Sequence, residues 1–422
     1  MTHADGMPKE HPATTSAEHS AARLLQLLQA RQTEDVAPLL SEEMTAAAPA
    51  DRLQIVWDSL GALQEQRQRA VQVVDGATLI QYALRFERAA IDALVTVDAQ
   101  GRIAGFLLRP AQDVVPVPDV PAGAGYTERT LDIAEPRGPL PATLALPRGD
   151  GPFPGVVLVH GSGPHDRNET VGPNRPFLDV ARGLADRGIA VLRYDKRTHA
   201  RPQDFAAGTY TVDDETTDDA VAAIATLSAQ PGVDAGRIYV VGHSQGGMLA
   251  PRIAARSGRV AGVVMWSAPA RSLLTLLPEQ NRYLLSLDGG ISPEEQVFLD
   301  ALDAQIAKAR NDEDAPASAL PLGLPASYWR SFEAIDPLAD TRALDLPILL
   351  LHGGRDFQVT ATDWALWKQL PLSQRITRRD YPANNHLGMP GTGAPTLQEY
   401  QQPGHVAPDM IRDIGDWIEA QR

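Results

Sequence analysis

The sequence predicts an α/β protein in which a mostly parallel sheet carries an inserted helical segment and follows a smaller α+β domain. Three observations indicate this arrangement. From about residue 126 onward, short apolar strands alternate with helices, which is the pattern of parallel β-α-β units. Before that point, helical periodicity gives way to a run of strands. A stretch rich in proline and glycine separates the two patterns.

Composition excludes several classes of partner and chemistry. The chain of 422 residues is 43% hydrophobic and 22% charged, as in ordinary globular proteins. Its net charge of -15 argues against a nucleic-acid partner and against an anionic membrane surface. The absence of cysteine excludes disulfides, cysteine nucleophiles and thiolate metal sites. No long apolar run or signal-peptide pattern is present, so we expect a cytoplasmic protein, or a secreted or periplasmic one if a signal peptide preceded these residues.

The first part of the chain changes from helical to β-type patterning. Within residues 18–60, "ARLLQLLQA" and "DRLQIVWDSLGALQ" repeat apolar residues every three and four positions, which predicts helices. From 67 to 109, four β-rich runs follow one another, separated by turn signals such as the one at Asp75. Helices followed by a meander predict a small α+β domain over 18–109, and we expect residues 1–17 to be disordered.

The second part of the chain begins after a predicted linker at 110–125, which four prolines stiffen and glycines end. Residues 126–422 open with two strands of antiparallel type, "TERTLDI" and "ATLAL". They continue with apolar strands such as "GVVLVHGSG" and "LPILLLHGGRD", which are typical of a parallel sheet buried on both faces. Between two of these strands, about 270–335 is mostly helical and far too long for a connecting loop, which predicts a cap.

The stretch "VVGHSQGGML" places Ser244 between two glycines in the spacing G-x-S-x-G. A predicted strand, "RIYVV", precedes the motif, and a predicted helix follows it directly. A serine in such a strand-to-helix turn is exposed above the carboxyl end of the sheet, because Gly242 and Gly246 have no side chains to obstruct the tight backbone. This context favours a nucleophile over an ordinary glycine-rich turn.

A serine nucleophile needs a general base and a carboxylate that orients it. In this type of sheet the chain order is serine, acid, histidine. Asp356 follows the next-to-last strand, and His386 lies in "YPANNHLG" directly after the last strand. His352 precedes the acid and is therefore misplaced, whereas His405 before the final helix is the serious rival to His386.

An oxyanion formed during acyl transfer needs two N–H donors held in place. We expect the N–H of Gln245, directly after the nucleophile, to be one. The turn after the first long parallel strand, "HGSGPHDRNE", supplies the other, with Ser162 as the first candidate and Gly163 as the next. His165, Asp166, Arg167 and Glu169, which follow in this turn, are expected to form a charged cluster that braces the loop rather than to bind substrate.

No metal or cofactor is predicted. The acidic segment "DDETTDD" at 213–219 could suggest a cation site, but a solvated helix start matched to the helix dipole is the favoured interpretation. The segment "GDGPFPG" lacks the G-x-x-x-x-G-K pattern of a phosphate-binding loop.

Taken together, these motifs resemble the α/β-hydrolase fold over 126–422. The segments "HGSGPHDRNE", "AVLRYDKRT" and "GHSQGG" are similar to those of EstD-type bacterial esterases. That resemblance implies a serine carboxylesterase with a helical cap that favours short acyl chains. It assigns the catalytic roles to Ser244, Asp356 and His386, and the oxyanion site to Gln245 and Ser162. The first 115 residues resemble a small domain of the nuclear-transport-factor-2 type, for which dimerisation or substrate shielding is expected.

The favoured function is therefore hydrolysis of small or short-acyl carboxylic esters through an acyl-enzyme. A serine peptidase of the prolyl-oligopeptidase type shares the nucleophile motif, although no propeller repeat precedes it. Acyl transfer to an acceptor other than water and a non-catalytic binding protein are further alternatives, and a homodimer is compatible with all of them. Six apolar cap residues are expected either to line or cover the acyl pocket or, for at least half of them, to form the cap's own small core: Tyr283, Leu284, Leu285, Tyr328, Trp329 and Phe332.

Overall fold

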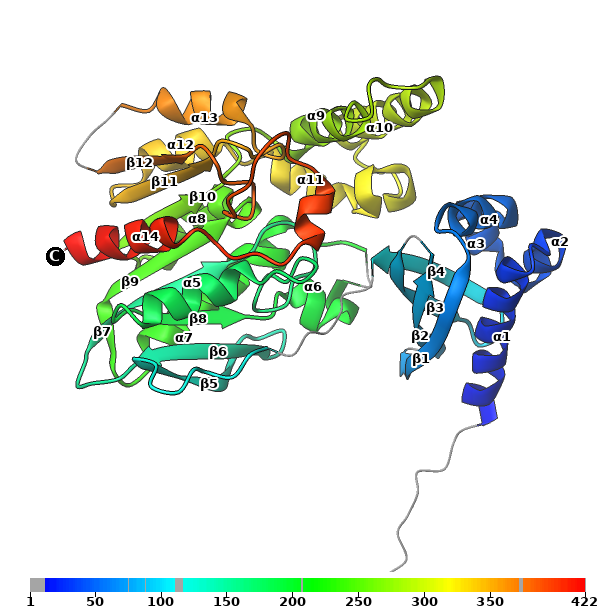
Figure 1. The fold of residues 1–422 in the computed structure, drawn as a ribbon, viewed down its shortest axis with the longest axis horizontal. Coiled ribbons are helices and arrows are strands. Elements are labelled where there is room, and N and C mark those ends of the chain that lie inside the picture. Colours follow the sequence, from blue (N-terminus) through cyan, green and yellow to red (C-terminus); the bar gives the residue numbers. More distant parts are fainter. Residues whose placement is uncertain are drawn as a thin grey trace, which may run out of the picture. The chain divides into compact units, whose positions relative to one another are not determined.

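The computed structural model divides the chain into two compact units, with the boundary between residues 115 and 116 (Figure 1). The structure describes residues 12–74, 76–87, 89–110, 117–205, 208–371 and 375–421. The expected turn residue Asp75 and much of the expected linker, at 111–116, lie outside the described residues, as do residues 1–11.

The first unit consists of helices packed on a four-stranded antiparallel sheet. Its helices are α1 (Pro12–Gln29), α2 (Thr33–Val36), η1 (Ala37–Leu39), α3 (Glu42–Ala47) and α4 (Ala50–Ser59). Its strands are β1 (Leu63–Val74), β2 (Ala77–Phe86), β3 (Ala90–Val97) and β4 (Ile103–Pro110), paired in chain order. Burial alternates along β2 because one face of the sheet packs on the helices. The predicted order of helices followed by a meander is confirmed.

One expectation for this unit is wrong. Residues 12–17 were expected to be disordered, but α1 begins at Pro12. The reason is that Ala17 is buried together with Ala21 and Leu24, so the apolar face of the helix extends one turn further than its leucines indicate.

The second unit is built on an eight-stranded sheet in the order β12-β11-β10-β9-β7-β8-β6-β5. The strands are β5 (Tyr126–Ile133), β6 (Leu140–Pro147), β7 (Phe153–Val159), β8 (Ala190–Tyr194), β9 (Val233–His243), β10 (Gly262–Trp266), β11 (Ile348–Gly353) and β12 (Ile376–Tyr381). Strands β7 to β12 run parallel, and the hairpin of β5 and β6 extends the sheet antiparallel to β8. The mostly parallel sheet predicted from the sequence is confirmed.

Both faces of the parallel strands are buried, as their continuous apolar composition predicts. In β7, Val156 and Leu158 pack in the core beneath α5 and α14, whereas Val157 and Val159 pack in the core on the opposite face. The helices that complete the layers are α5 (Pro176–Ala185), α6 (Arg197–Ala200), α7 (Asp218–Ser228), α8 (Gln245–Ser257), α13 (Ala361–Lys368) and α14 (Pro408–Ala420).

The chain between β10 and β11 is helical. It forms α9 (Leu273–Leu285), α10 (Pro293–Asn311), α11 (Ala326–Glu333) and α12 (Pro337–Ala343), with α9 and α10 lying side by side (Figure 1). Ser292 and Glu295 start α10 with a reciprocal capping box. Helices α9 to α11 occupy the segment expected to form the cap. No helix within the described residues combines the length and apolar character needed to span a membrane.

Candidate active site

Ser244 lies at the junction of β9 and α8 in a backbone conformation that side-chain-bearing residues rarely adopt. Its φ is 52° and its ψ is -118°. The Ser244 N–H donates to the Trp266 carbonyl at 2.8 Å, and the Ser244 carbonyl accepts from the Met248 N–H at 2.9 Å. These bonds hold the turn on both sides, so its strain is fixed by the sheet and by the first turn of the helix.

The two glycines of the motif are required by close backbone contact. A Cβ on Gly242 would collide with the Gly246 carbonyl, and a Cβ on Gly246 would collide with the Val159 carbonyl. The spacing G-x-S-x-G is therefore what allows the helix to begin immediately above the sheet.

Asp356 and His386 meet at the same edge of the sheet, in the loops after β11 and β12. The His386 Nδ1 lies 2.7 Å from the Asp356 Oδ2, and both side chains are buried. The other oxygen of Asp356 accepts from the N–H groups of Gln358 and Val359, each at 2.9 Å. Burial by itself would raise the pKa of Asp356, but His386 and these N–H groups lower it below the usual range. A charged Asp356 accepts a hydrogen bond from the Nδ1–H of His386, which leaves the Nε2 on the other side of the ring directed away from the carboxylate.

The other two candidate histidines lie elsewhere. His405 is largely exposed and contacts Asp179 at 3.0 Å. His352 stacks on Trp364, with ring centroids 5.0 Å apart. Of the three, only His386 contacts Asp356.

A cavity of about 200 Å³ brings Ser244 and His386 together. Its lining comprises Gly161, Ser162, His165, Glu169, Val171, His243, Ser244, Gln358, His386, Leu387, Leu397 and Tyr400. The cavity thus joins the nucleophile motif, the histidine loop and the turn after β7, as the sequence predicts for the carboxyl ends of neighbouring parallel strands.

None of the six cap residues expected at the acyl pocket belongs to this lining. Tyr328, Trp329 and Phe332 are buried in the core that the cap shares with the sheet. Tyr283 and Leu284 pack against the cluster of Phe357, Leu387, Met389 and Tyr400, of which Leu387 and Tyr400 line the cavity. Helical periodicity cannot separate a cap's own core from a pocket lining, because both require apolar residues.

The turn after β7 presents Ser162 to the cavity. The Gly161 N–H already donates to the Glu169 Oε1 at 2.6 Å, so it is engaged within the protein. Gly163 has φ 95°, a conformation that favours glycine, and lets the chain turn away after Ser162. Gln245 is the first residue of α8, where the N–H has no partner inside the helix.

Sequence reasoning missed the contacts of His243, the residue before Ser244. Its Nδ1 lies 3.0 Å from the Glu169 Oε2, and its Nε2 lies 2.9 Å from the His386 carbonyl. Burial lowers the pKa of His243, but the Glu169 carboxylate outweighs this effect and raises it overall. Burial likewise opposes ionisation of Glu169, yet the neighbouring histidines lower its pKa to about 2. One buried ion pair thus links the β7 turn, the nucleophile motif and the loop of His386.

The charged cluster predicted in the β7 turn is not a single unit. Arg167 pairs with Asp195 at 2.7 Å, and Asp166 accepts from the Asn168 and Thr170 N–H groups. Glu169 alone of the charged residues in this turn reaches His243. Its φ of 50° marks the unusual turn that points it inward.

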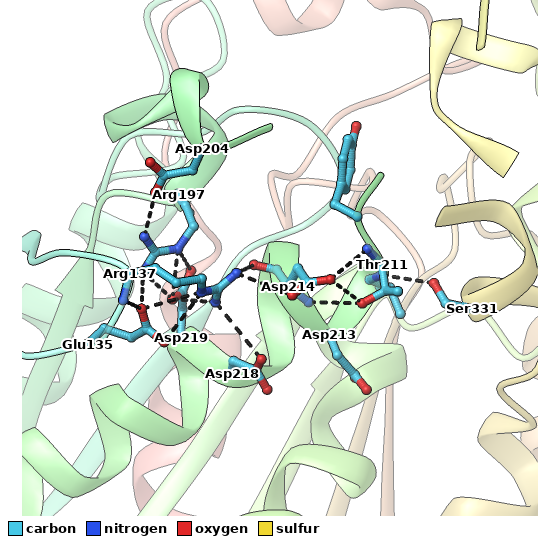
Figure 2. A network of polar contacts seen from close by, with 12 residues as sticks. Glu135, Arg137, Arg197, Asp204, Thr211, Asp213, Asp214, Asp218, Asp219 and Ser331 are labelled. Carbon is cyan, nitrogen blue, oxygen red and sulfur yellow. Dashed lines mark hydrogen bonds and ion pairs between the residues drawn. The ribbon is translucent and has the colours of Figure 1, made fainter. Parts of the chain in front are cut away.

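The acidic segment "DDETTDD" differs from the expected solvated helix start. Residues Asp213–Thr217 form a π-helix before α7, and Glu215, Thr216, Thr217 and Asp219 are buried. Figure 2 shows the polar network that surrounds this segment, in which Asp219 contacts Arg197 at 2.7 Å. Among the described residues there is no group of His, Asp and Glu side chains suited to a metal ion. Glu215 and Asp219 pair with the buried cations Lys196 and Arg197, whereas Asp213 and Asp218 pair with the more exposed Arg252 and Arg256.

A pH effect on stability follows from His160, at the end of β7. Burial lowers the pKa of His160 from 6.5 to about 3. The unfolded chain takes up a proton on this ring below pH 6.5, whereas the folded chain does so only near pH 3. His160 therefore makes the fold less stable as pH falls through this window, by about 1.4 kcal/mol per pH unit, and has no such effect above it.

This effect is measurable as a difference between wild type and His160→Gln. Chemical unfolding between pH 7.5 and 4.5 gives both free energies of unfolding, and their difference should shift in favour of the variant as pH falls. A difference that stays constant over this range would contradict a neutral buried His160.

Comparison with known proteins identifies the family of this chain. The model of the alpha/beta hydrolase family matches residues 156–408. The chain belongs to this family. It is 35% identical over 407 residues to esterase EstD of Thermotoga maritima, covering 95% of each protein. It is also 26% identical over 236 residues to a non-heme haloperoxidase of Rhodococcus erythropolis, covering 51% of this chain and 81% of the relative.

Among solved structures, an esterase of Pyrococcus furiosus matches with a TM-score of 0.46 at 16% identity, covering 73% of this chain and 96% of the other. The predicted fold class and the resemblance to EstD-type esterases are confirmed by the family match and by the near full-length similarity to EstD.

Proposed function

We propose that this protein is a serine hydrolase that cleaves small, short-acyl carboxylic esters through an acyl-enzyme. One observation supports the proposal most directly: Ser244 and His386 line the same cavity, and the buried carboxylate of Asp356 lies 2.7 Å from the Nδ1 of His386. The similarity to esterase EstD over 95% of the chain supports esters as the substrate class.

In the proposed reaction the Ser244 Oγ attacks the ester carbonyl while His386 Nε2 takes its proton. Asp356 stabilises the imidazolium that forms. The carbonyl oxygen becomes an anion, which the N–H groups of Gln245 and Ser162 stabilise. His386 then gives its proton to the leaving alkoxide, and the alcohol departs. His386 then takes a proton from water, whose oxygen attacks the acyl carbonyl; the bond to the Ser244 Oγ breaks, and His386 returns the proton to that oxygen as the acid departs.

The cavity size favours short acyl chains. A volume of about 200 Å³ is below the roughly 300–1,000 Å³ of typical small-molecule sites. Leu397 and Tyr400 form part of its wall and belong to η6 (Leu397–Gln401). Arg355 holds this segment in place by donating to the Gly393 carbonyl at 2.9 Å and to Glu399 at 3.1 Å. Selectivity is thus expected to come from this loop more than from the cap helices.

This assignment predicts a definite substrate profile. Among p-nitrophenyl esters, kcat/KM should be highest for short acyl groups and should fall from butyrate to octanoate to palmitate. Leu397→Ala should raise the octanoate-to-butyrate ratio by about tenfold, because it lengthens the pocket. Leu322→Ala, at an exposed cap position outside the lining, is the matched control and should leave the ratio unchanged.

The same panel distinguishes the alternatives. Faster cleavage of peptide p-nitroanilides than of any ester would indicate a peptidase. Product esters formed in the presence of an added alcohol, in excess of hydrolysis, would indicate an acyltransferase. An octanoate-to-butyrate ratio that is the same in Leu397→Ala and the parent would contradict the role of the η6 loop.

A further inference from the structure

We propose that the buried ion pair of Lys196 and Glu215 positions both N–H donors of the oxyanion site and connects them to helix α11 of the cap. This inference rests on the proposed function, since it names what holds that site in its reactive geometry. Lys196 and Glu215 are positioning residues, because neither belongs to the cavity lining.

The pair is deeply buried between segments that are distant in sequence. Lys196 follows β8, Glu215 lies in the π-helix Asp213–Thr217, and their side chains are 2% and 6% exposed. The Lys196 Nζ lies 2.9 Å from the Glu215 Oε1. Removing two charges from water is costly, so a buried ion pair is weak evidence for a gain in stability; holding neighbouring groups in one geometry is a role that such pairs have in some proteins.

Lys196 acts on the first donor through the peptide bond between Gly161 and Ser162. Its Nζ donates to the Gly161 carbonyl at 2.8 Å. In a planar trans peptide the carbonyl and the following N–H point in opposite directions. Fixing the Gly161 carbonyl on Lys196 therefore directs the Ser162 N–H the other way, toward the cavity that Ser162 lines.

Glu215 acts on the second donor, the Gln245 N–H, through its Oε2 atom. The Oε2 accepts from the Gln245 Nε2 at 2.9 Å and from the Tyr328 hydroxyl at 3.0 Å. Gln245 is thereby anchored by its side chain while its backbone N–H remains at the start of α8. Tyr328 belongs to α11, so the same carboxylate ties the cap to the oxyanion site.

The surroundings hold Glu215 rigidly. On one side of it, Asp213 pairs with Arg252 at 2.7 Å, and Asp214 accepts from the Thr211 hydroxyl. On the other side, Asp219 pairs with the fully buried Arg197 (Figure 2). The π-helix, an element often found at functional sites, is thus fixed at both ends. The acidic segment acquires a role beyond charge balance: it presents one carboxylate to Lys196, Gln245 and Tyr328.

The test compares Lys196→Met, Glu215→Gln and the double variant with Arg193→Met. Arg193 is the matched control, since it is a similarly buried cation on β8, pairs with Glu128 at 3.0 Å and contacts neither donor segment.

Active-site titration with a fluorophosphonate normalises each preparation to its folded, reactive fraction. The readouts are kcat and KM for p-nitrophenyl butyrate and the inhibition constant of a butyl trifluoromethyl ketone. Ser244 adds to this ketone to give a tetrahedral oxyanion, its proton passing to His386.

We expect each of the three variants to lower kcat by about 10- to 100-fold, with KM within about threefold of the parent. The ketone should bind more weakly by a factor similar to the loss in kcat, because both depend on the oxyanion donors. The double variant should lose less than the product of the two single losses, since the residues act as one unit. Arg193→Met should keep the parent's kcat and ketone affinity per titrated site.

Parent-like kcat and ketone affinity in Glu215→Gln and the double variant would overturn the inference while leaving the proposed hydrolase intact. Equal losses in Arg193→Met would also overturn it, because any buried cation would then have the same effect. A parent enzyme that neither reacts with the fluorophosphonate at Ser244 nor cleaves the ester would instead refute the proposed function itself.

Discussion

Ser244→Ala is expected to lower kcat for p-nitrophenyl butyrate by about 10⁶ without unfolding the protein, because it removes the nucleophile on which both chemical steps depend. Steady-state hydrolysis and circular dichroism measure the two effects. Ser267→Ala is the control: Ser267 directly follows the neighbouring strand β10 and, like Ser244, has a positive φ, here 46°, although it is buried and Ser244 is partly exposed. It does not line the cavity, so its substitution should leave kcat near the parent value.

A folded Ser244→Ala protein that kept more than a tenth of the parent activity would show that another group performs the attack. Comparable losses in Ser244→Ala and Ser267→Ala would attribute the effect to the strained edge of the sheet, since alanine at either position removes a hydroxyl from the same kind of turn.

The second large effect separates the two rival histidines. His386→Ala should be about as damaging as the serine substitution, near 10⁶ in kcat, because Ser244 then has no base and the leaving group no acid. His405→Ala should change kcat by less than about twofold, since it removes only a surface contact with Asp179. Hydrolysis rates of the two purified variants provide the comparison. The reverse order of effects would move the base to His405 and leave the Asp356–His386 contact without a catalytic purpose.

The fold could be predicted because its determinants are local. Continuous apolar strands such as Val156–Val159 favour burial on both faces, and the glycines around Ser244 permit the tight strand-to-helix turn that side chains at these positions would block. Asp356 and His386 were predicted from their place in the strand order, which brings the ends of parallel strands together. The predicted domain boundaries, the nuclear-transport-factor-2 resemblance and a homodimer remain predictions.

The residues that sequence reasoning missed act through contacts between distant segments. Glu169 and His243 are 74 positions apart and meet only because β7 and β9 are neighbours in the sheet. Lys196 lies in "AVLRYDKRT" and Glu215 in "DDETTDD", but nothing in either segment indicates that the two side chains pair, and an acidic segment next to a helix has the same composition whether it is solvated or buried. The sequence left the role of the cap residues open for a related reason: Tyr328 and Trp329 are apolar enough for either a pocket wall or a core, and the structure shows them in the core.

The most direct test of the account is the mass of the enzyme trapped during turnover. p-Nitrophenyl butyrate is mixed with the parent enzyme, quenched in acid within milliseconds and digested for mass spectrometry. We predict one butyryl group on the peptide that contains Ser244, located on the serine itself, and none in Ser244→Ala. A butyryl group on another residue, or rapid turnover in the parent with no acylated peptide at any quench time, would contradict an acyl-enzyme on Ser244.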